Sequence, residues 1–517
     1  MADAFSGSSE IAIQRVLDVE VRKNTPEEKL DELYQIKRTC EFIREHAFGK
    51  VALQFPDELL VDSVAVAEQI ERTSQTKTYI LGDTSYGSCC VDEVAAEHIG
   101  ADCIVHFGAA CLSPTRRLPV AYVFEERRLD VETCAASFRD LHPDTQTRVV
   151  LLYDVSYHHA VEDLLARLAL EYPNLVASEL VVEGERCLVH GREQNGAPRL
   201  SEDSQVVCQF GRRFSVEPGT SLTDYRMFFV GQEGATLRNF MMAWNRCSFC
   251  SFDPVSLMGR AESVNVNRAL MKRYYAIERA KDAGVVGILV GTLGVAEYLA
   301  VIQQLKEAIR RAGKRSYVFA VGKPNVPKLA NFPEIDVFVL VACPENSLLD
   351  SGEFFKPVVT PFEMEVACNR KRAWSEEYVT DFRHLLPGGR SHVPLVADDE
   401  GEDDETDVSL ITGALRSQNL SSGPAEPSYG SSVVLRNQTL TVANTNTAGT
   451  TRAVFKSGFI GELCTNSSVF VDFCSVLPGG SKLARFGAEA GRDGGREGGG
   501  GPERHCHRLR GGRNVLK

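Results

Sequence analysis

The chain has 517 residues, of which 43% are hydrophobic and 25% charged, and its net charge is −13. This composition is typical of a soluble globular protein of roughly two to four domains. The negative charge argues against nucleic-acid binding, which needs a basic surface. No apolar run approaches the ~20 residues of a membrane span, and the first residues lack the pattern of a secretory signal. We therefore expect a cytoplasmic protein that binds neither nucleic acid nor membrane.

The segment from about Gly49 to Phe362 uses one pattern three times: an apolar run, a loop and an amphipathic helix. The three openings are VALQFPDELLVDSVAVAEQI from Val51, VVLLYDVSYHHAVEDLLARL from Val149 and VVGILVGTLGVAEYLAVIQQL from Val285. Further apolar runs follow in each unit, and LVASELVV from Leu175 is the weakest match among them. Short closing strands are expected at Val120–Phe124 and Pro357–Pro361.

The apolar runs are continuous rather than alternating, which favours parallel strands covered on both faces. Alternation of strand and helix then predicts right-handed βαβ units. The expected fold class is α/β, with three homologous small parallel-sheet domains around a central site and a disordered C-terminal region. The expected boundaries are 1–34 for an N-terminal extension, 35–140, 141–260 and 261–390 for the three α/β domains, and 391–517 for a largely disordered tail.

The tail is assigned from its composition. It opens with the acidic run Asp398–Asp407 and continues rich in Ser, Thr and Asn. Its last segment is rich in Gly and Arg, and cannot form a core. Cys506 lies there between two histidines, where adventitious clustering is favoured over a metal site.

Fifteen cysteines in a reducing compartment must be buried thiols or metal ligands, because disulfides are disfavoured there. Cys90, Cys111 and Cys343 share one predicted position, a loop at the carboxyl end of a parallel strand, where pockets form in such sheets. Thiolates in that place suit a soft metal or an iron–sulfur cluster, although the spacing alone does not prove one. Neighbours in an extended loop point to opposite sides, so only one of Cys89 and Cys90 is expected to ligate.

The other motifs in the sequence indicate a function less strongly. The CSFC pair of Cys247 and Cys250 could be half a zinc site or a redox dithiol, but the second pair is missing and structural thiols are favoured. The turn Gly291–Val295 could cradle an anion on its backbone N–H groups or simply connect a strand to a helix. Motifs of P-loop, GxSxG and HExxH enzymes are absent from the sequence.

Several segments together resemble the diphthamide synthesis family, and the second of its two paralogous subunits more than the first. The resemblance spans roughly residues 30 to 415 and is highly specific as a combination. It is carried by VALQFPDELL, GDTSYGSCCVDE, HFGAACLSP, VVGILVGTLGVA, GKRSYVFAVGKP, KLANFPEIDVFVLVACP and DVSLITG.

The resemblance implies three α/β domains holding a 4Fe–4S cluster, with one cysteine contributed per domain. In this family the cluster cleaves S-adenosylmethionine, and the resulting 3-amino-3-carboxypropyl radical adds to one histidine of elongation factor 2. The first ligand position maps to the Cys89–Cys90 pair, of which Cys90 is chosen, and the third maps to Cys343.

The second domain departs from this pattern. The catalytic paralogue carries a Gly-Cys-Thr-Ser-Pro-like segment there, and nothing like it occurs between Val149 and Asp253. Cys111 then becomes the candidate for the remaining ligand. The resemblance thus implies a non-catalytic, cluster-bearing subunit that keeps the cluster of its partner reduced. S-adenosylmethionine would be the co-substrate of the complex, bound by the partner.

The partners implied by the resemblance are the catalytic diphthamide biosynthesis subunit 1, as a heterodimer, and elongation factor 2 as protein substrate. A zinc-containing electron carrier, diphthamide biosynthesis protein 3, and an NADH-dependent reductase would supply electrons. Two alternatives stay open: a catalytic homodimer, and a cluster-free structural subunit. The Gly/Arg-rich end departs from relatives, and a different final exon or a shifted reading frame would explain it.

Overall fold

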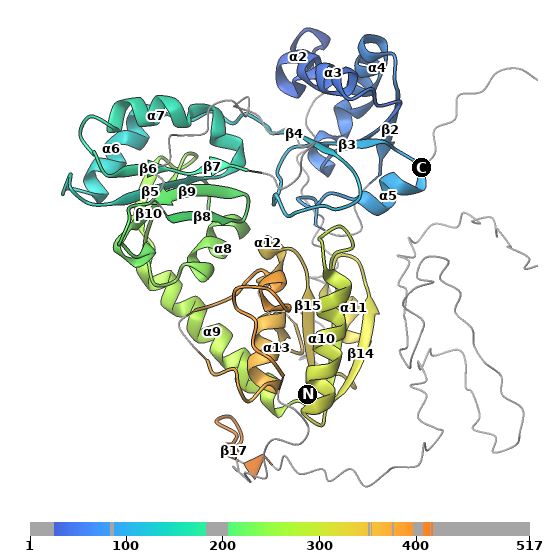
Figure 1. Cartoon of the computed structure of the whole chain (residues 1–517), viewed down its shortest axis with the longest axis vertical. Helices are drawn as coiled ribbons and strands as arrows, with labels where there is room; N and C mark the ends of the chain where they lie inside the picture. The colour runs from blue at the N-terminus through green and yellow to red at the C-terminus, as the bar shows by residue number, and fades with distance from the viewer. Residues whose placement is uncertain are drawn as a thin grey trace, which may run out of the picture. The chain divides into compact units, whose positions relative to one another are not determined.

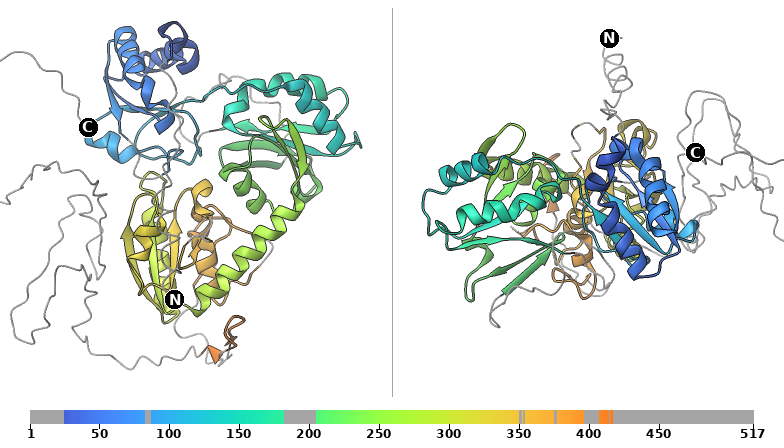
Figure 2. Two further views of the ribbon diagram at one scale, coloured as in Figure 1. Left: turned by 180° about the vertical axis from the view of Figure 1, so that it is seen from behind. Right: turned by 90° about the horizontal axis from the view of Figure 1, so that it is seen from above.

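The described part of the chain contains three parallel β-sheets, each with helices packed against it (Figures 1 and 2). This computed structural model describes residues 25–82, 87–181, 205–349, 352, 354–374, 377–395, 407–413 and 415–416. The predicted α/β class with parallel sheets is confirmed. The predicted domain boundaries stay predictions. The long Gly/Arg-rich end lies outside the described residues.

The first sheet has the strand order β2-β1-β3-β4, with every neighbouring pair parallel. Its strands are β1 (Lys50–Gln54), β2 (Lys77–Leu81), β3 (Cys103–Phe107) and β4 (Val120–Val123). Its helices are α2 (Glu27–Tyr34), α3 (Ile36–Glu45), α4 (Ser63–Ser74) and α5 (Glu93–His98), with a 3-10 turn at Asp57–Asp62. All five residues of β3 are buried, as its continuous apolar pattern predicts.

The second sheet repeats this order as β6-β5-β10-β11 and adds one antiparallel edge strand, β12. Its strands are β5 (Val149–Tyr153), β6 (Leu175–Ala177), β10 (Arg226–Val230), β11 (Ser248–Asp253) and β12 (Met258–Ala261). Helices α6 (Val131–Leu141) and α7 (Val161–Leu168) pack on one face, and α8 (Ala235–Ala243) on the other (Figure 1). A separate antiparallel sheet joins β7 (Glu179–Leu180), β9 (Arg212–Val216) and β8 (Gln205–Gln209).

The third sheet has the order β14-β13-β15-β16, which matches the first sheet strand for strand. Its strands are β13 (Val285–Val290), β14 (Arg315–Ala320), β15 (Val337–Val341) and β16 (Val358–Val359). Its helices are α9 (Ser263–Asp282), α10 (Tyr298–Arg311), α11 (Val326–Ala330), α12 (Pro344–Ser347) and α13 (Pro361–Cys368). The same order in three sheets agrees with the repeat in the sequence, and the expected closing strands correspond to β4 and β16.

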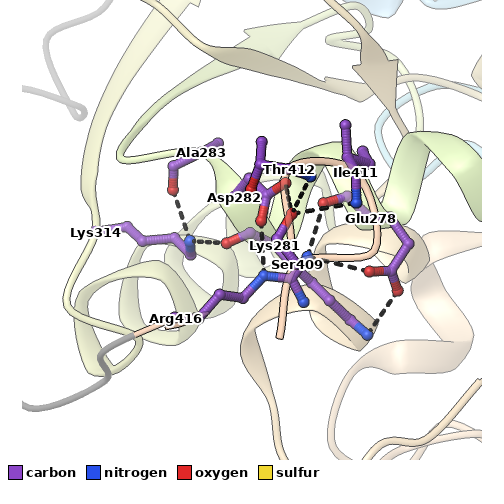
Figure 3. A network of polar contacts seen from close by, with 9 residues as sticks. All are labelled: Glu278, Lys281, Asp282, Ala283, Lys314, Ser409, Ile411, Thr412 and Arg416. Atoms are coloured by element: carbon purple, nitrogen blue, oxygen red, sulfur yellow. Dashed lines mark hydrogen bonds and ion pairs between the residues drawn. The ribbon is translucent and has the colours of Figure 1, made fainter. Parts of the chain in front are cut away.

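A short hairpin of β17 (Asp407–Val408) and β18 (Leu415–Arg416) lies in the region that the sequence predicts to be largely disordered. Polar contacts join it to the end of α9 (Figure 3). Asp282 accepts hydrogen bonds from Ser409 Oγ at 2.7 Å and from Arg416 Nε at 2.6 Å. Lys314 Nζ donates to the carbonyls of Lys281 and Ala283, where a helix end favours a cation.

No described helix is both long and apolar enough to cross a membrane.

Candidate metal centre

Loops at the carboxyl ends of strands from the first and third sheets meet at one point. Cys111 follows β3, and Cys343 follows β15 as the residue that precedes α12. Parallel strands direct their carboxyl ends to the same edge of a sheet, so the loops of that edge gather there. Pro344 occupies the first turn of α12, where its missing N–H costs nothing. The loop bearing Cys343 is thereby fixed between a buried strand and a helix start.

Four cysteine sulfurs gather at this point. The Sγ atoms of Cys89, Cys90, Cys111 and Cys343 all lie within 4.8 Å of one another, and they form the one such metal-binding group among the described residues. Individual separations are 4.0 Å between Cys89 and Cys90, 3.9 Å between Cys89 and Cys343, and 3.9 Å between Cys111 and Cys90. We call these four residues the cysteine centre.

The three cysteines chosen from the sequence are therefore brought together, and Cys89 joins them. The sequence reasoning missed it by assuming an extended loop. Instead, Cys90 N donates to Gly87 O at 3.0 Å, which closes a turn and directs both neighbouring thiols to the same side. Cys111 N also donates to Cys89 O at 3.1 Å and so joins the two loops of the first sheet.

Buried polar groups hold these loops in place. Gln54, at the end of β1 and 1% exposed, donates from Nε2 to Cys90 O at 2.8 Å and accepts from Asp92 N at 2.9 Å. Gly294, in the turn considered as an anion cradle, lies so near this loop that a Cβ on it would be 2.2 Å from Val91 O. That glycine therefore permits close contact between the loops that follow β13 and β2.

The electrostatics of the cysteine centre favour a metal. Hydrogen bonding from the Cys343 thiol holds the pKa of Cys111 well below its usual range, and the pKa of Cys343 is raised well above it in return. The pKa values of Cys89 and Cys90 are raised as well, chiefly by hydrogen bonding to Cys111. Without a metal, the sulfurs therefore differ in how readily they ionise, with Cys111 the most acidic. A cation would stabilise the thiolate form of all four.

The donor set fits a soft metal or an iron–sulfur cluster, because it consists of thiols alone, three of them buried. The separations near 4 Å resemble the roughly 3.8 Å between thiolates around one tetrahedral ion with 2.3 Å metal–sulfur bonds. A four-iron cluster is larger than a single ion, so the thiols would have to move apart to hold it. The chemistry of the ligands therefore fits both kinds of group, whereas their present spacing is that of a single ion and must widen to hold a cluster.

A cavity of about 180 Å³ adjoins the cysteine centre on the side of Cys111. It is lined by segments of all three units: Cys111–Pro114, Val181, Cys208–Gly211, Pro344, Asp381, Arg383 and His384. Cys111 is the member of the cysteine centre that lines this cavity. Cys208 lines the cavity too, but does not belong to the cysteine centre.

The CSFC pair takes the structural role that the sequence favoured. Cys247 packs in the core on one face of the second sheet and donates from Sγ to Leu222 O at 3.4 Å. Cys250, within β11, packs in the core on the opposite face. The two thiols therefore cannot bind one ion without distorting the strand. Cys506 lies outside the described residues.

Comparison with known proteins gives a consistent family. A family model described as "Putative diphthamide synthesis protein" matches residues 55–379. Three curated relatives are named "2-(3-amino-3-carboxypropyl)histidine synthase subunit 2". The Danio rerio protein is 59% identical over 87% of this chain and 90% of its own length. The Gallus gallus protein is 51% identical over 87% of this chain and 91% of its own length. The Homo sapiens protein is 41% identical over 80% of this chain and 86% of its own length.

Two solved structures are also similar in outline. Dph2 from Pyrococcus horikoshii matches with a TM-score of 0.49 and 20% identity over 69% of this chain and 96% of that chain. A second structure of that protein, with a 4Fe-4S cluster, matches with a TM-score of 0.49 and 19% identity over 66% and 93%. The family model and the curated relatives cover most of the chain, and the cysteine loops fall within the matched residues. The chain therefore belongs to the diphthamide synthesis protein family.

Proposed function

We propose that this chain is the non-catalytic, cluster-bearing subunit of a 3-amino-3-carboxypropyl transferase that begins diphthamide synthesis on a histidine of elongation factor 2. Its curated relatives are named as subunit 2 of a histidine synthase, which supports a heterodimer with a catalytic subunit 1. S-adenosylmethionine is the co-substrate, bound by that partner. A zinc-containing electron carrier and an NADH-dependent reductase supply electrons in the cytosol.

The cysteine centre is the observation that carries this proposal. Cys90, Cys111 and Cys343 supply buried thiols for a 4Fe–4S cluster, and the second unit supplies none among the described residues. A bound 4Fe–4S cluster accepts and returns single electrons, which is the chemistry a relay requires. The residues of this chain hold the thiols and keep three of them from solvent, and a cavity adjoins Cys111.

The first test is an iron and sulfide count with EPR spectroscopy on anaerobically purified heterodimer, with the catalytic subunit's own cluster ligands mutated. We expect about four irons per heterodimer, as a 4Fe–4S cluster requires, and a reducible signal. Cys343→Ser and Cys111→Ser should lose most of the iron, because an alkoxide is a poor soft ligand. Cys103→Ser, a buried cysteine outside the cysteine centre, is the matched control and should keep it.

The electron-relay role is tested separately, by measuring product formation in the transferase reaction. Heterodimer with an intact catalytic subunit should form product with the carrier, the reductase and S-adenosylmethionine. Cys343→Ser in this chain should slow product formation, and a strong chemical reductant supplied directly should restore it. Slow product formation that the chemical reductant does not restore would contradict a relay.

The spacing of the thiols favours a second candidate, a single tetrahedral zinc ion that stabilises the subunit. In that case the same preparation contains one zinc ion and no reducible signal, and the chain is a structural partner. A preparation with no metal at all leaves the cluster-free structural subunit. Product formed by this chain alone, without subunit 1, would instead favour the catalytic homodimer.

A further inference from the structure

Cys89 has a contact that no other member of the cysteine centre shares. The side-chain amide of Asn346 donates from Nδ2 to Cys89 Sγ at 3.3 Å. Asn346 lies on α12, one turn after Cys343, and its backbone N donates to Cys343 O at 3.0 Å. The helix that begins at one thiol of the cysteine centre thus carries the group that binds another. A hydrogen bond from an uncharged amide stabilises a thiolate without competing for the metal.

Gly87 makes room for this contact. A Cβ built on Gly87 would lie 2.0 Å from Asn346 Nδ2 and 3.0 Å from its Cγ. Any larger residue at this position must therefore displace the Asn346 side chain. Because Gly87 O also accepts the hydrogen bond that closes the turn before Cys90, the same residue shapes the turn and admits the amide.

We infer that Cys89 is the fourth thiolate of the cysteine centre and that Asn346 is its positioning residue, so that this chain alone completes the coordination of the metal. The inference rests on the proposed function and deepens it. Three cysteines would leave one iron of a cluster open to an added ligand. Four leave none, so the centre is suited to electron transfer and unsuited to binding S-adenosylmethionine.

The contact also bears on the reduction potential. Hydrogen bonds to ligand sulfurs withdraw negative charge from the metal and make it easier to reduce. Removing the Asn346 amide should therefore move the potential to more negative values while iron content is kept. Removing the Cys89 thiolate should instead change the coordination itself. The two substitutions are distinguishable because loss of the Asn346 amide changes only the reduction potential, whereas loss of the Cys89 thiolate changes the set of ligands.

The experiment uses anaerobic heterodimer with the catalytic subunit's ligands mutated, and adds S-adenosylmethionine to the reduced protein. We expect the wild-type EPR spectrum to be unchanged by the addition. Cys89→Ala should still hold iron on the other three cysteines, and its spectrum should shift when S-adenosylmethionine or a small thiol binds the open iron. Cys368→Ser, a partly exposed cysteine outside the cysteine centre, is the control and should behave as wild type.

Potentials are measured by redox titration of the same preparations. At the potential that reduces half of the wild-type centre, the reduced fraction should fall several-fold in Asn346→Ala and in Gly87→Ala. The double variant should show no further fall, because both changes remove one contact. Asn331→Ala, on the exposed end of α11, is the matched control. Thermal melting checks that each variant is folded.

The outcomes separate this inference from the proposed function. Suppose that wild type binds iron and that Cys89→Ala has the same EPR spectrum and reduction potential, with or without added ligand. Cys89 is then not the fourth thiolate, and the proposed relay is unaffected. If the shifts in reduction potential of Asn346→Ala and Gly87→Ala add up in the double variant, the proposed role of Asn346 is wrong. Wild-type protein without iron removes the proposed function, and the inference with it.

Discussion

Among the residues that the structure describes, Glu363 carries a buried charge with several partners outside the cysteine centre. Its side chain is fully buried and forms an ion pair with Arg273 of α9. Tyr378 Oη donates to Glu363 Oε1 at 2.7 Å, and Thr360 N donates to Oε2 at 2.8 Å. Thr360 and Glu363 also form the capping box of α13. One carboxylate therefore joins α9, α13 and the chain that follows.

Glu363→Ala should cost about 3–5 kcal/mol of stability, because it leaves the Arg273 charge buried without a counter-ion. Urea unfolding of the purified chain measures the loss. Glu307→Ala, which removes a partly exposed partner of Arg310 and Arg311, is the control and should cost less than about 1 kcal/mol. Equal losses in the two variants would show that Arg273 finds another anion or water when Glu363 is removed.

Metal retention by the cysteine centre should rise with pH. The pKa values of Cys89, Cys90 and Cys343 lie above the usual thiol range, so these three groups are protonated at neutral pH and must each lose a proton to ligate. Every such proton contributes about a factor of ten in affinity per pH unit below its pKa. Chelator competition at several pH values measures this slope. A slope of zero would mean that the thiols are already ionised without metal.

At the scale of elements, the strands that the sequence predicts best are those with continuous apolar runs. β5 and β15 are buried along their whole length, and a buried parallel strand leaves that signature. β6 has three half-buried residues, which is why its pattern is weak. The hairpin of β8 and β9 escaped prediction because its turn puts Phe210 at φ 52°, where a bulky residue is uncommon.

The cysteine centre could likewise be predicted only in part from the sequence. The sequence places Cys90, Cys111 and Cys343 at strand ends, because that edge of a parallel sheet is fixed by topology. Whether Cys89 joins them depends on the hydrogen bond that closes the turn from Gly87, which local sequence pattern does not specify. The contact from Asn346 depends on a packing distance between distant loops, which no single-chain pattern contains.

The hairpin of β17 and β18 should detach from α9 in Arg416→Ala. Arg416 contacts both Asp282 and Glu278, and its side chain is 11% exposed. Loss of these charged hydrogen bonds should lower the free energy of local opening by roughly 1–3 kcal/mol. Lys281 still neutralises Glu278, so the global stability should change little. Hydrogen exchange at residues 407–416 measures the opening, and Arg310→Ala on an exposed helix face is the control.

At the scale of the molecule, three sheets of one topology are used unequally. The first and third provide the thiols, and the second provides Cys208–Gly211 to the wall of the adjoining cavity. A repeat in which the described residues of one copy supply no ligand can still close a metal site, provided another copy supplies more than one thiol. The pair Cys89 and Cys90 meets that condition here. Such a division is consistent with a subunit that holds a metal centre while the partner performs the chemistry.

Because its ligands meet only in the folded chain, the cysteine centre should link metal binding to global stability. A metal that binds the native state alone stabilises it by about 4 kcal/mol when present at 1,000 times its dissociation constant. Loaded protein should therefore unfold at a higher temperature than protein stripped by a chelator under anaerobic conditions. The difference should disappear in a variant with Cys111→Ser and Cys343→Ser and persist in Cys368→Ser. Equal unfolding temperatures for loaded and stripped wild type would mean that the metal binds unfolded cysteines equally well, and that the three loops do not form one native site.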